Sequence, residues 1–314
     1  MTELPRSRAL MRMDGPGHIM PVEPITPPDS SAWRFVHFPV MLGLVAAGLL
    51  LAAVLAIDLL GLVLQFFTYI PGGRYLVPLI ALAAVITVYW VFVRIIERRP
   101  AIDELGASGW LKEFGLGLCG GLALALATFA LQGVLGDVRI LGFNPPQVML
   151  LPIVVQVCTA AILEIVLRGI AFRQGERLLG SWLSLAASVI AFWVAALVSG
   201  HAEPFSMLAY VLHPGLVCTA LYMVTRRLWA AIGLHAAWNL GLIALDGVAT
   251  SDTGPHGLVL SRVVGPDWLT GAGANAEASV PALAINALLT IVLLAIAVRR
   301  GRIVRPLWLR GRSA

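Results

Sequence analysis

Residues 147–167 read QVMLLPIVVQVCTAAILEIVL, a continuous apolar run that holds one carboxylate, Glu164, near its end. A run of about 20 apolar residues can cross a hydrocarbon core about 30 Å thick as a helix. In lipid, only helices and closed barrels satisfy the backbone, and uninterrupted apolar runs favour helices. Together with similar runs elsewhere, it predicts an all-α integral membrane protein without strands, a single bundle of about eight transmembrane helices. The predicted spans are 39–64, 75–95, 114–136, 147–167, 182–200, 205–225, 229–246 and 279–298.

The composition and charge of the chain agree with this class. Hydrophobic residues make up 59% of the 314 residues and charged residues only 12%, whereas a soluble protein carries about 25%. With both termini in the cytoplasm, 19 of the 22 basic residues lie on the cytoplasmic side, as the positive-inside rule requires. The net charge of +5 is therefore explained without nucleic acid as a partner, and the basic tail is expected to meet anionic lipid heads.

Three parts are predicted along the chain. Residues 1–38 are rich in proline and indicate a disordered cytoplasmic arm. Residues 39–300 form the eight-helix membrane domain, and 301–314 form a basic cytoplasmic tail. The charged segment ERRPAIDELGASGWLKE, at 97–113, suits an amphipathic surface segment, and the exterior loop at 247–278, rich in small residues, is expected to be mobile.

Three polar clusters interrupt the apolar runs. They are Glu164 with Arg168 in LEIVLRG, His201 in LVSGHAEP, and His235 with Asn239 in LHAAWN. Ionisable side chains at membrane depth are costly and often functional. Residues four apart share one helical face, and a turn at 180–181 would place Glu164 about 24 Å from that turn. The clusters can therefore converge in one reaction centre inside the bilayer.

Each cluster also has a structural interpretation. Glu164 and Arg168 could form a neutralised pair that ties helices together, and His235 with Asn239 could be interhelical hydrogen-bond contacts. His201, near a helix end, could simply meet water. His213 precedes Pro214 and is interpreted as structural, because proline frees backbone groups that a polar side chain can satisfy.

Other common catalytic and metal motifs are missing from the sequence. There is no HExxH motif for a zinc protease. The GASG string at 106–109 lies in a charged loop, so its match to a serine-protease motif is taken as chance. The three cysteines are far apart and fit neither a disulfide framework nor a CxxC metal site, so they are interpreted as small apolar side chains: Cys119, Cys158 and Cys218.

The ordered trio of clusters resembles the CAAX prenyl endopeptidase and bacteriocin-processing family (CPBP, or Abi) of membrane proteases. The family signature is EExxxR on one transmembrane helix, FxxxH on the next, and HxxxN or HxxxD later. Here the matching stretches are LEIVLR at 163–168, LVSGH at 197–201 and HAAWN at 235–239. Gly169 and the ERRPAIDELG stretch also fit, so the resemblance covers about 94–246.

This resemblance implies an intramembrane endopeptidase that hydrolyses peptide bonds of membrane-associated peptides or proteins. In the family, the glutamate and the first histidine would activate a water, and the last histidine and the asparagine would hold the oxyanion. The resemblance therefore implies these catalytic residues, with Arg168 in support: Glu164, His201, His235 and Asn239. The family label also implies a divalent metal such as zinc, held by His201 and His235 if by any residue. A hydrophobic or lipidated peptide substrate, lipid contacts and a bacterial inner (plasma) membrane location are further expectations.

Two positions depart from the family signature. Leu163 stands where the first glutamate belongs, and Leu197 stands where the phenylalanine belongs. Leucine cannot accept a proton, and a shift of one residue turns a side chain about 100° around the helix. The sequence therefore leaves two functions open: an active endopeptidase, or a weakly active or inactive protease-fold protein that binds hydrophobic peptides or partner membrane helices.

Overall fold

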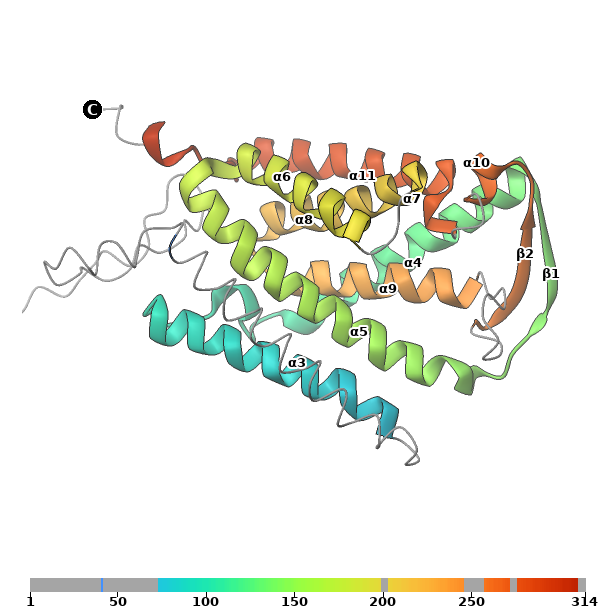
Figure 1. Cartoon of the computed structure of the whole chain (residues 1–314), viewed down its shortest axis with the longest axis horizontal. Helices are drawn as coiled ribbons and strands as arrows, with labels where there is room; N and C mark the ends of the chain where they lie inside the picture. Colours follow the sequence, from blue (N-terminus) through green and yellow to red (C-terminus); the bar gives the residue numbers. More distant parts are fainter. Residues whose placement is uncertain (1–40, 42–72, 199–202, 246–256, 272–275, 310–314) are drawn as a thin grey trace, which may run out of the picture.

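The computed structural model describes residues 41, 73–198, 203–245, 257–271 and 276–309. They form an elongated bundle of helices with a small two-stranded sheet at one end (Figure 1). The principal elements are α3 (Gly73–Val91), η2 (Phe92–Ile96), η3 (Asp103–Leu105), α4 (Trp110–Leu135), β1 (Asp137–Phe143), η4 (Pro146–Met149), α5 (Leu150–Glu164), η5 (Ile165–Phe172), α6 (Arg173–Val198), α7 (Pro204–Tyr210), η6 (Val211–Val217), α8 (Cys218–Thr225), α9 (Trp229–Leu245), β2 (Val259–Val264), α10 (Asp267–Thr270), η7 (Ala276–Ala278), α11 (Val280–Arg299) and η8 (Leu307–Leu309).

Several of these helices can cross a membrane. Within the described residues, five are long and apolar enough to do so: Gly73–Ile96, Trp110–Leu135, Pro146–Val194, Pro204–Thr225 and Val280–Arg299. The shorter helix Trp229–Leu245 is also apolar. A multi-pass helical membrane protein is therefore supported. The expected span at 39–64 lies outside the described residues except at 41, so the count of eight and the orientation stay predictions.

The longest of these apolar helices consists of two arms that meet at Gly180. This glycine has φ 75° and ψ 172°, a conformation that side-chain-bearing residues rarely adopt. A Cβ atom there would lie only 2.7 Å from the backbone nitrogen of Pro306. The chain therefore turns back at the position predicted from the sequence, and α5 and α6 run in opposite directions (Figure 1).

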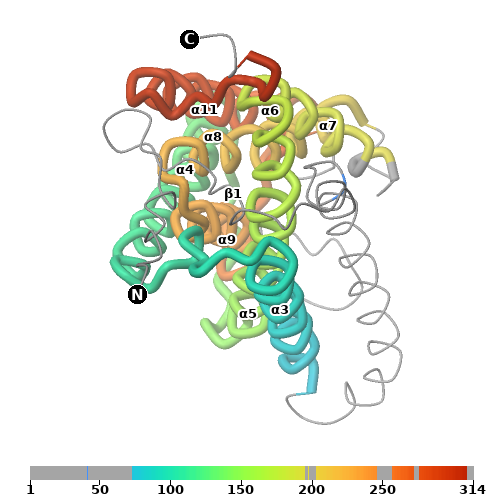
Figure 2. Tube along the Cα trace, turned by 90° about the vertical axis from the view of Figure 1, so that its left-hand side faces the viewer, coloured from blue at the N-terminus to red at the C-terminus, as the bar shows by residue number. Residues whose placement is uncertain are grey.

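Helix α9 lies inside the bundle and packs against α4, α5 and α8 (Figure 2). Every residue from Ala230 to Trp238 is buried. The backbones of α4 and α9 touch, because a Cβ at Gly117 would lie 2.2 Å from the carbonyl oxygen of Ala230, and one at Gly121 would lie 2.3 Å from that of Leu234. Small residues spaced four apart allow this approach in membrane helices, and the contact fixes the position of α9.

A buried ion network joins the end of η2 to the start of α6. The Glu97 carboxylate accepts hydrogen bonds from both terminal nitrogens of Arg173, at 3.1 and 2.7 Å, and from Gln174 at 2.6 Å. Arg99 pairs with Glu104 at 2.9 Å. Glu97, Arg99 and Glu104 are each at most 6% exposed. The expectation of an amphipathic surface segment at 97–113 was therefore wrong for its first part, because these charges pair with each other and with α6.

The prediction that the chain has no strands was also wrong. β1 pairs with β2 in antiparallel register, from Asp137 opposite Val264 to Phe143 opposite Val259. Both strands lie beyond the ends of the long helices (Figure 1), and branched aliphatic side chains favour extended backbone. Within the loop expected to be mobile, residues 257–271 instead form β2 and α10, and Gln132 of α4 donates a hydrogen bond to the carbonyl of the buried Leu269.

The start of the basic tail packs on the turn between α5 and α6. The backbone nitrogen of Ser181 donates to the carbonyl of Val304 at 3.0 Å, and the nitrogen of Val304 donates to the Ser181 hydroxyl at 2.8 Å. Val304 is buried. Residues 1–38 and 310–314 lie outside the described part of the chain.

The charge of Glu97 should stabilise the fold at neutral pH. Burial alone would raise the pKa of this carboxyl, but Arg173 and the neighbouring arginines outweigh it and hold the pKa below 4.5. Glu97→Gln should then lower the free energy of unfolding by about 3–5 kcal/mol at pH 7, because the buried Arg173 guanidinium loses its nearest carboxylate and keeps only Glu104, at 3.4 Å. The contribution is present above the unfolded-state pKa, so the difference should shrink as the pH falls through the folded-state pKa.

Denaturant unfolding in detergent at pH 7 and at acid pH measures both effects. Glu113→Gln is the matched control, since Glu113 pairs with Arg227 at 3.0 Å but the two side chains are 28% and 23% exposed. A partly exposed pair should contribute only about 0–1 kcal/mol. Equal losses in the two variants would show that the Glu97 network does not stabilise the fold.

Candidate functional site

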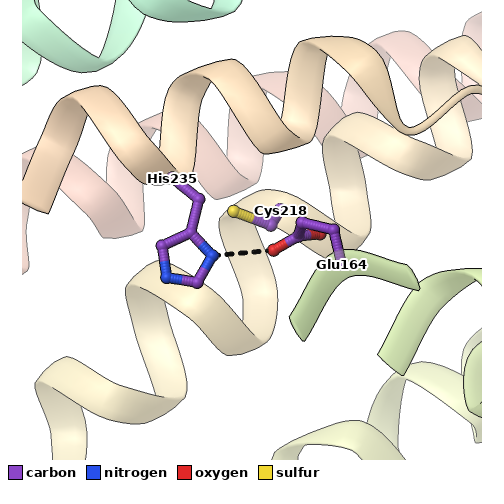
Figure 3. Close-up of side chains that lie close together, drawn as sticks. All are labelled: Glu164, Cys218 and His235. Carbon is purple, nitrogen blue, oxygen red and sulfur yellow. Dashed lines mark hydrogen bonds and ion pairs between the residues drawn. The ribbon is translucent and has the colours of Figure 1, made fainter. Parts of the chain in front are cut away.

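Glu164 is the centre of the site. It ends α5, its side chain is fully buried, and its Oε1 accepts a hydrogen bond from Nη1 of Arg168 at 3.1 Å. Nδ1 of His235, on α9, lies 2.9 Å from the same oxygen. Figure 3 shows this contact between side chains that come from two different helices. The structure thus brings together Glu164, Arg168 and His235, as the expected convergence of the polar clusters requires.

Arg168 is held on every side. Its Nε donates to the Thr219 hydroxyl at 3.2 Å, and its Nη2 donates to the carbonyl of Gly215 at 3.3 Å. The guanidinium carbon also lies 5.4 Å from the centre of the Phe192 ring. Arg168 is 1% exposed, and a charge buried this deeply must be paired. Besides its pair with Glu164, Arg168 therefore connects η5, which carries it, to η6, α8 and α6.

Two π-helical segments shape the site. η5 begins directly after Glu164 and carries Arg168, while η6 carries His213 and Pro214. A proline inside a helix clashes with the carbonyl of the residue four positions earlier, and the wider π turn accommodates it. Single π turns inside α-helices occur frequently at functional sites. Each segment therefore brings one polar side chain close to His235 of α9: Arg168 from η5 and His213 from η6.

Asn239 lies one turn along α9 from His235 but contacts another partner. Its Nδ2 donates to Oε1 of Gln156 at 3.0 Å, and Gln156 is two turns before Glu164 on α5. The two contacts, His235 with Glu164 and Asn239 with Gln156, form a polar seam between α5 and α9. Asn239 is therefore near the centre without bonding to Glu164.

The first histidine of the motif cannot be placed. His201 lies outside the described residues. Leu197, four positions earlier, is described and is 52% exposed on α6. The Leu197 side chain is therefore on the surface of the described bundle.

The structure adds side chains that the sequence analysis did not assign to the site. Nδ1 of His213 lies 2.9 Å from Oδ1 of Asn286 on α11. The His213 ring stacks on Trp238 with centroids 4.7 Å apart, and its centroid is 5.8 Å from that of His235. An ionisable side chain within a membrane span is a functional signal. His213 lies in the predicted span 205–225, so the same rule would have made it a candidate site residue if it had not been interpreted as structural beside Pro214. Asn286 and Trp238 carry no comparable signal in the sequence.

Three buried polar atoms near this centre have no partner among the described residues: Oε2 of Glu164, Nε2 of His213 and Nε1 of Trp238. Buried polar atoms are nearly always hydrogen-bonded in native proteins. Two of the three can accept a hydrogen bond and one can donate, which is the set that a water molecule or a peptide group would satisfy. Each of the three atoms is therefore open to a hydrogen bond from a polar group that enters the bundle.

The fit of a divalent metal depends on Glu164, His235 and Cys218. Their ligand atoms lie within 4.8 Å of one another and all three residues are buried, and zinc takes oxygen, nitrogen and sulfur ligands. However, His235 is already bonded to Glu164, and the Arg168 cation binds the same carboxylate oxygen. A second, divalent cation beside this guanidinium would be repelled. In this arrangement the described residues do not fit the metal that the family label implies, and His201, the other expected ligand, lies outside the described residues.

A comparison with protein families agrees with the geometry. Residues 145–241 match the family model described as Type II CAAX prenyl endopeptidase Rce1-like. The matched segment holds Glu164, Arg168, His235 and Asn239, whereas the ERRPAIDELG stretch at 97–106 lies before it. No match was found among curated proteins or solved structures. The similarity to the CAAX prenyl endopeptidase family is therefore confirmed over residues 145–241, which form an Rce1-like segment of the chain.

Proposed function

We propose that this chain is an intramembrane endopeptidase of the CAAX-processing type, which hydrolyses peptide bonds of membrane-associated peptides or proteins. The observation that carries the proposal is the buried 2.9 Å contact between Glu164 and His235, inside the segment that matches the family. A carboxylate and an imidazole at this distance can share a proton and act as general acid and base.

The proposed chemistry begins at the free oxygen of the carboxylate. Oε1 of Glu164 is engaged by Arg168 and His235, but Oε2 has no partner among the described residues and can accept a proton from a water. Asn239 has a second amide hydrogen besides the one it gives Gln156, so it can also donate to a developing oxyanion. Because water is scarce in such a buried site, these fixed groups act strongly.

A second function, binding without cleavage, is favoured by the same carboxylate. Arg168 and His235 both bind Oε1 of Glu164, so this oxygen already serves to hold α5, η5 and α9 together. Leu163, where the family places its first glutamate, is apolar and cannot replace it. On this alternative, the chain is a weakly active or inactive protease-fold protein that holds hydrophobic peptides or partner helices.

The surroundings of the site suggest the substrate class and location. The centre lies among helices that are long and apolar enough to cross a membrane, which supports a hydrophobic or lipidated peptide as the substrate. A bacterial inner membrane is the proposed location. No nucleic acid partner and no catalytic metal are part of the proposal, since the guanidinium of Arg168 already supplies the positive charge beside Glu164.

Cleavage by the purified chain tests the proposed function directly. The protein in lipid vesicles is incubated with prenylated and unprenylated peptide libraries, with and without a chelator, and products are identified by mass spectrometry. We expect cleavage that the chelator does not abolish. Cleavage that depends on added metal would contradict the charge argument at Arg168, and no cleavage of any peptide would favour the binding function.

Restoring the family residue should raise activity. Leu163 lies beside Glu164 and is half-buried, so Leu163→Glu adds a carboxylate that Arg168 does not already neutralise. A general base contributes about 10²–10⁴-fold to a rate, so cleavage should rise by a factor in that range. Leu163→Gln is the matched control, with the same size but no base. An equal rise in both variants would show that the added polarity, rather than the carboxylate, is responsible.

Glu164→Gln separates the two functions. Loss of the carboxylate leaves the Arg168 guanidinium with only neutral partners, which should lower the free energy of unfolding by about 3–5 kcal/mol. If Glu164 is also the base, cleavage should disappear in protein that remains folded at a temperature well below its unfolding midpoint. Full cleavage by a folded Glu164→Gln variant would assign Glu164 to structure alone.

A further inference from the structure

We propose that Gln156 is a positioning residue of this centre, which holds the Asn239 amide with its nitrogen available to the oxyanion. This inference rests on the proposed function, in which Asn239 donates to the developing oxyanion. Gln156 lies on α5, two turns before Glu164, and its Oε1 accepts a hydrogen bond from Nδ2 of Asn239 at 3.0 Å. The sequence analysis did not assign Gln156 to the site.

This contact leaves hydrogen-bonding groups free on both amides. Among the described residues, it is the only hydrogen bond of either side chain. An amide nitrogen carries two hydrogens, and an amide oxygen only accepts. The second hydrogen on Nδ2 of Asn239 and the Nε2 group of Gln156 are therefore without a partner in the described part of the chain.

The amide pair lies where the burial of α9 ends. Every residue from Ala230 to Trp238 is buried, whereas Asn239 and Gln156 are both partly exposed. Asn239 is one turn beyond His235, whose Nδ1 lies 2.9 Å from Oε1 of Glu164. The seam between α5 and α9 thus has a buried end at the carboxylate and a partly exposed end at the amides. Of the two ends, the amide pair is the one that a peptide group can approach from outside the bundle.

The orientation of the Asn239 amide decides whether it can serve the proposed reaction. An asparagine amide can turn by 180°, which exchanges its nitrogen with its oxygen, and the torsion that turns it is broad. An oxygen in the place of the nitrogen cannot donate to an oxyanion. Because Gln156 presents an oxygen, the Asn239 nitrogen is held on that side and its second hydrogen has a fixed direction. Fixed donors stabilise a developing charge without reorganising during the reaction.

A purely structural role for Gln156 explains less. Hydrogen bonds between side chains of membrane helices contribute little to helix association on average. α5 and α9 are already joined at the buried contact between Glu164 and His235. The two roles also differ in what they affect. A structural role acts on stability, whereas a positioning role acts on kcat and does so through Asn239.

The test measures kcat and KM for variants of the full chain in lipid vesicles, with a peptide that the unmodified protein cleaves. Gln156→Met keeps the length of the side chain but removes the acceptor. Its kcat should fall by about 3–10-fold, the factor that one hydrogen bond typically contributes, while KM stays near that of the parent. Asn239→Leu removes the donor itself and should lower kcat by about 10²–10³-fold. Gln156→Glu restores an acceptor oxygen and should recover most of the loss.

The variant that combines Gln156→Met with Asn239→Leu shows whether Gln156 acts through Asn239. If it does, Gln156→Met should cause no further fall in kcat once Asn239 is replaced. Gln132→Met is the matched control, because Gln132 is also a glutamine of an apolar helix, α4, and its Nε2 donates to the carbonyl of Leu269 instead. The kcat of folded Gln132→Met should equal that of the parent.

Several results would overturn the inference and leave cleavage itself standing. They are an unchanged kcat in folded Gln156→Met, the same fold-loss with and without Asn239, no recovery in Gln156→Glu, or an equal loss in Gln132→Met. If Gln156→Met does not fold, Gln156→Asn takes its place. That side chain is one methylene shorter and loses its reach to Asn239, so an unchanged kcat there also overturns the inference. No cleavage by the parent itself overturns both this inference and the proposed function.

Discussion

A guanidinium buried among apolar helices is the constraint on which the rest of this structure depends. Arg168 is 1% exposed, and Glu164 is the carboxylate within bonding distance of it. Leaving such a charge unpaired would cost several kcal/mol, so the helix that carries both residues must be oriented with this face inward. The remaining donors of Arg168 then set the positions of η6 and α8 through Gly215 and Thr219.

The same constraint determines what the site can do. Because Glu164 is fixed by Arg168, its carboxylate is a rigid acceptor for His235, which α9 brings to 2.9 Å. The close packing of α9 on α4, through glycines at 117 and 121, leaves little freedom for His235 to move away. On the proposed function, stability and chemistry therefore depend on the same carboxylate.

Hydropathy predicted the helical membrane fold and the turn at Gly180. The meeting of Glu164 with His235 was expected because ionisable side chains at membrane depth are costly unless they face one another inside the bundle. The sequence analysis missed features that depend on partners distant in the chain. The burial of Glu97 requires Arg173, the strands require each other, and the orientation of His213 requires Asn286, 73 residues later. A single sequence does not show these pairings, because nothing in the local sequence around either residue indicates which distant residue it will contact.

The most direct test of the central idea is a double-mutant cycle between Glu164 and His235. Denaturant unfolding and peptide cleavage are measured for Glu164→Gln, His235→Gln, the double variant and the parent. If the two side chains act as one unit, the free energies of unfolding should be non-additive by about 0.5–3 kcal/mol, and the double variant should be no less active than the worse single variant. Additive losses in both measurements would contradict a shared centre and leave the 2.9 Å contact without a functional role.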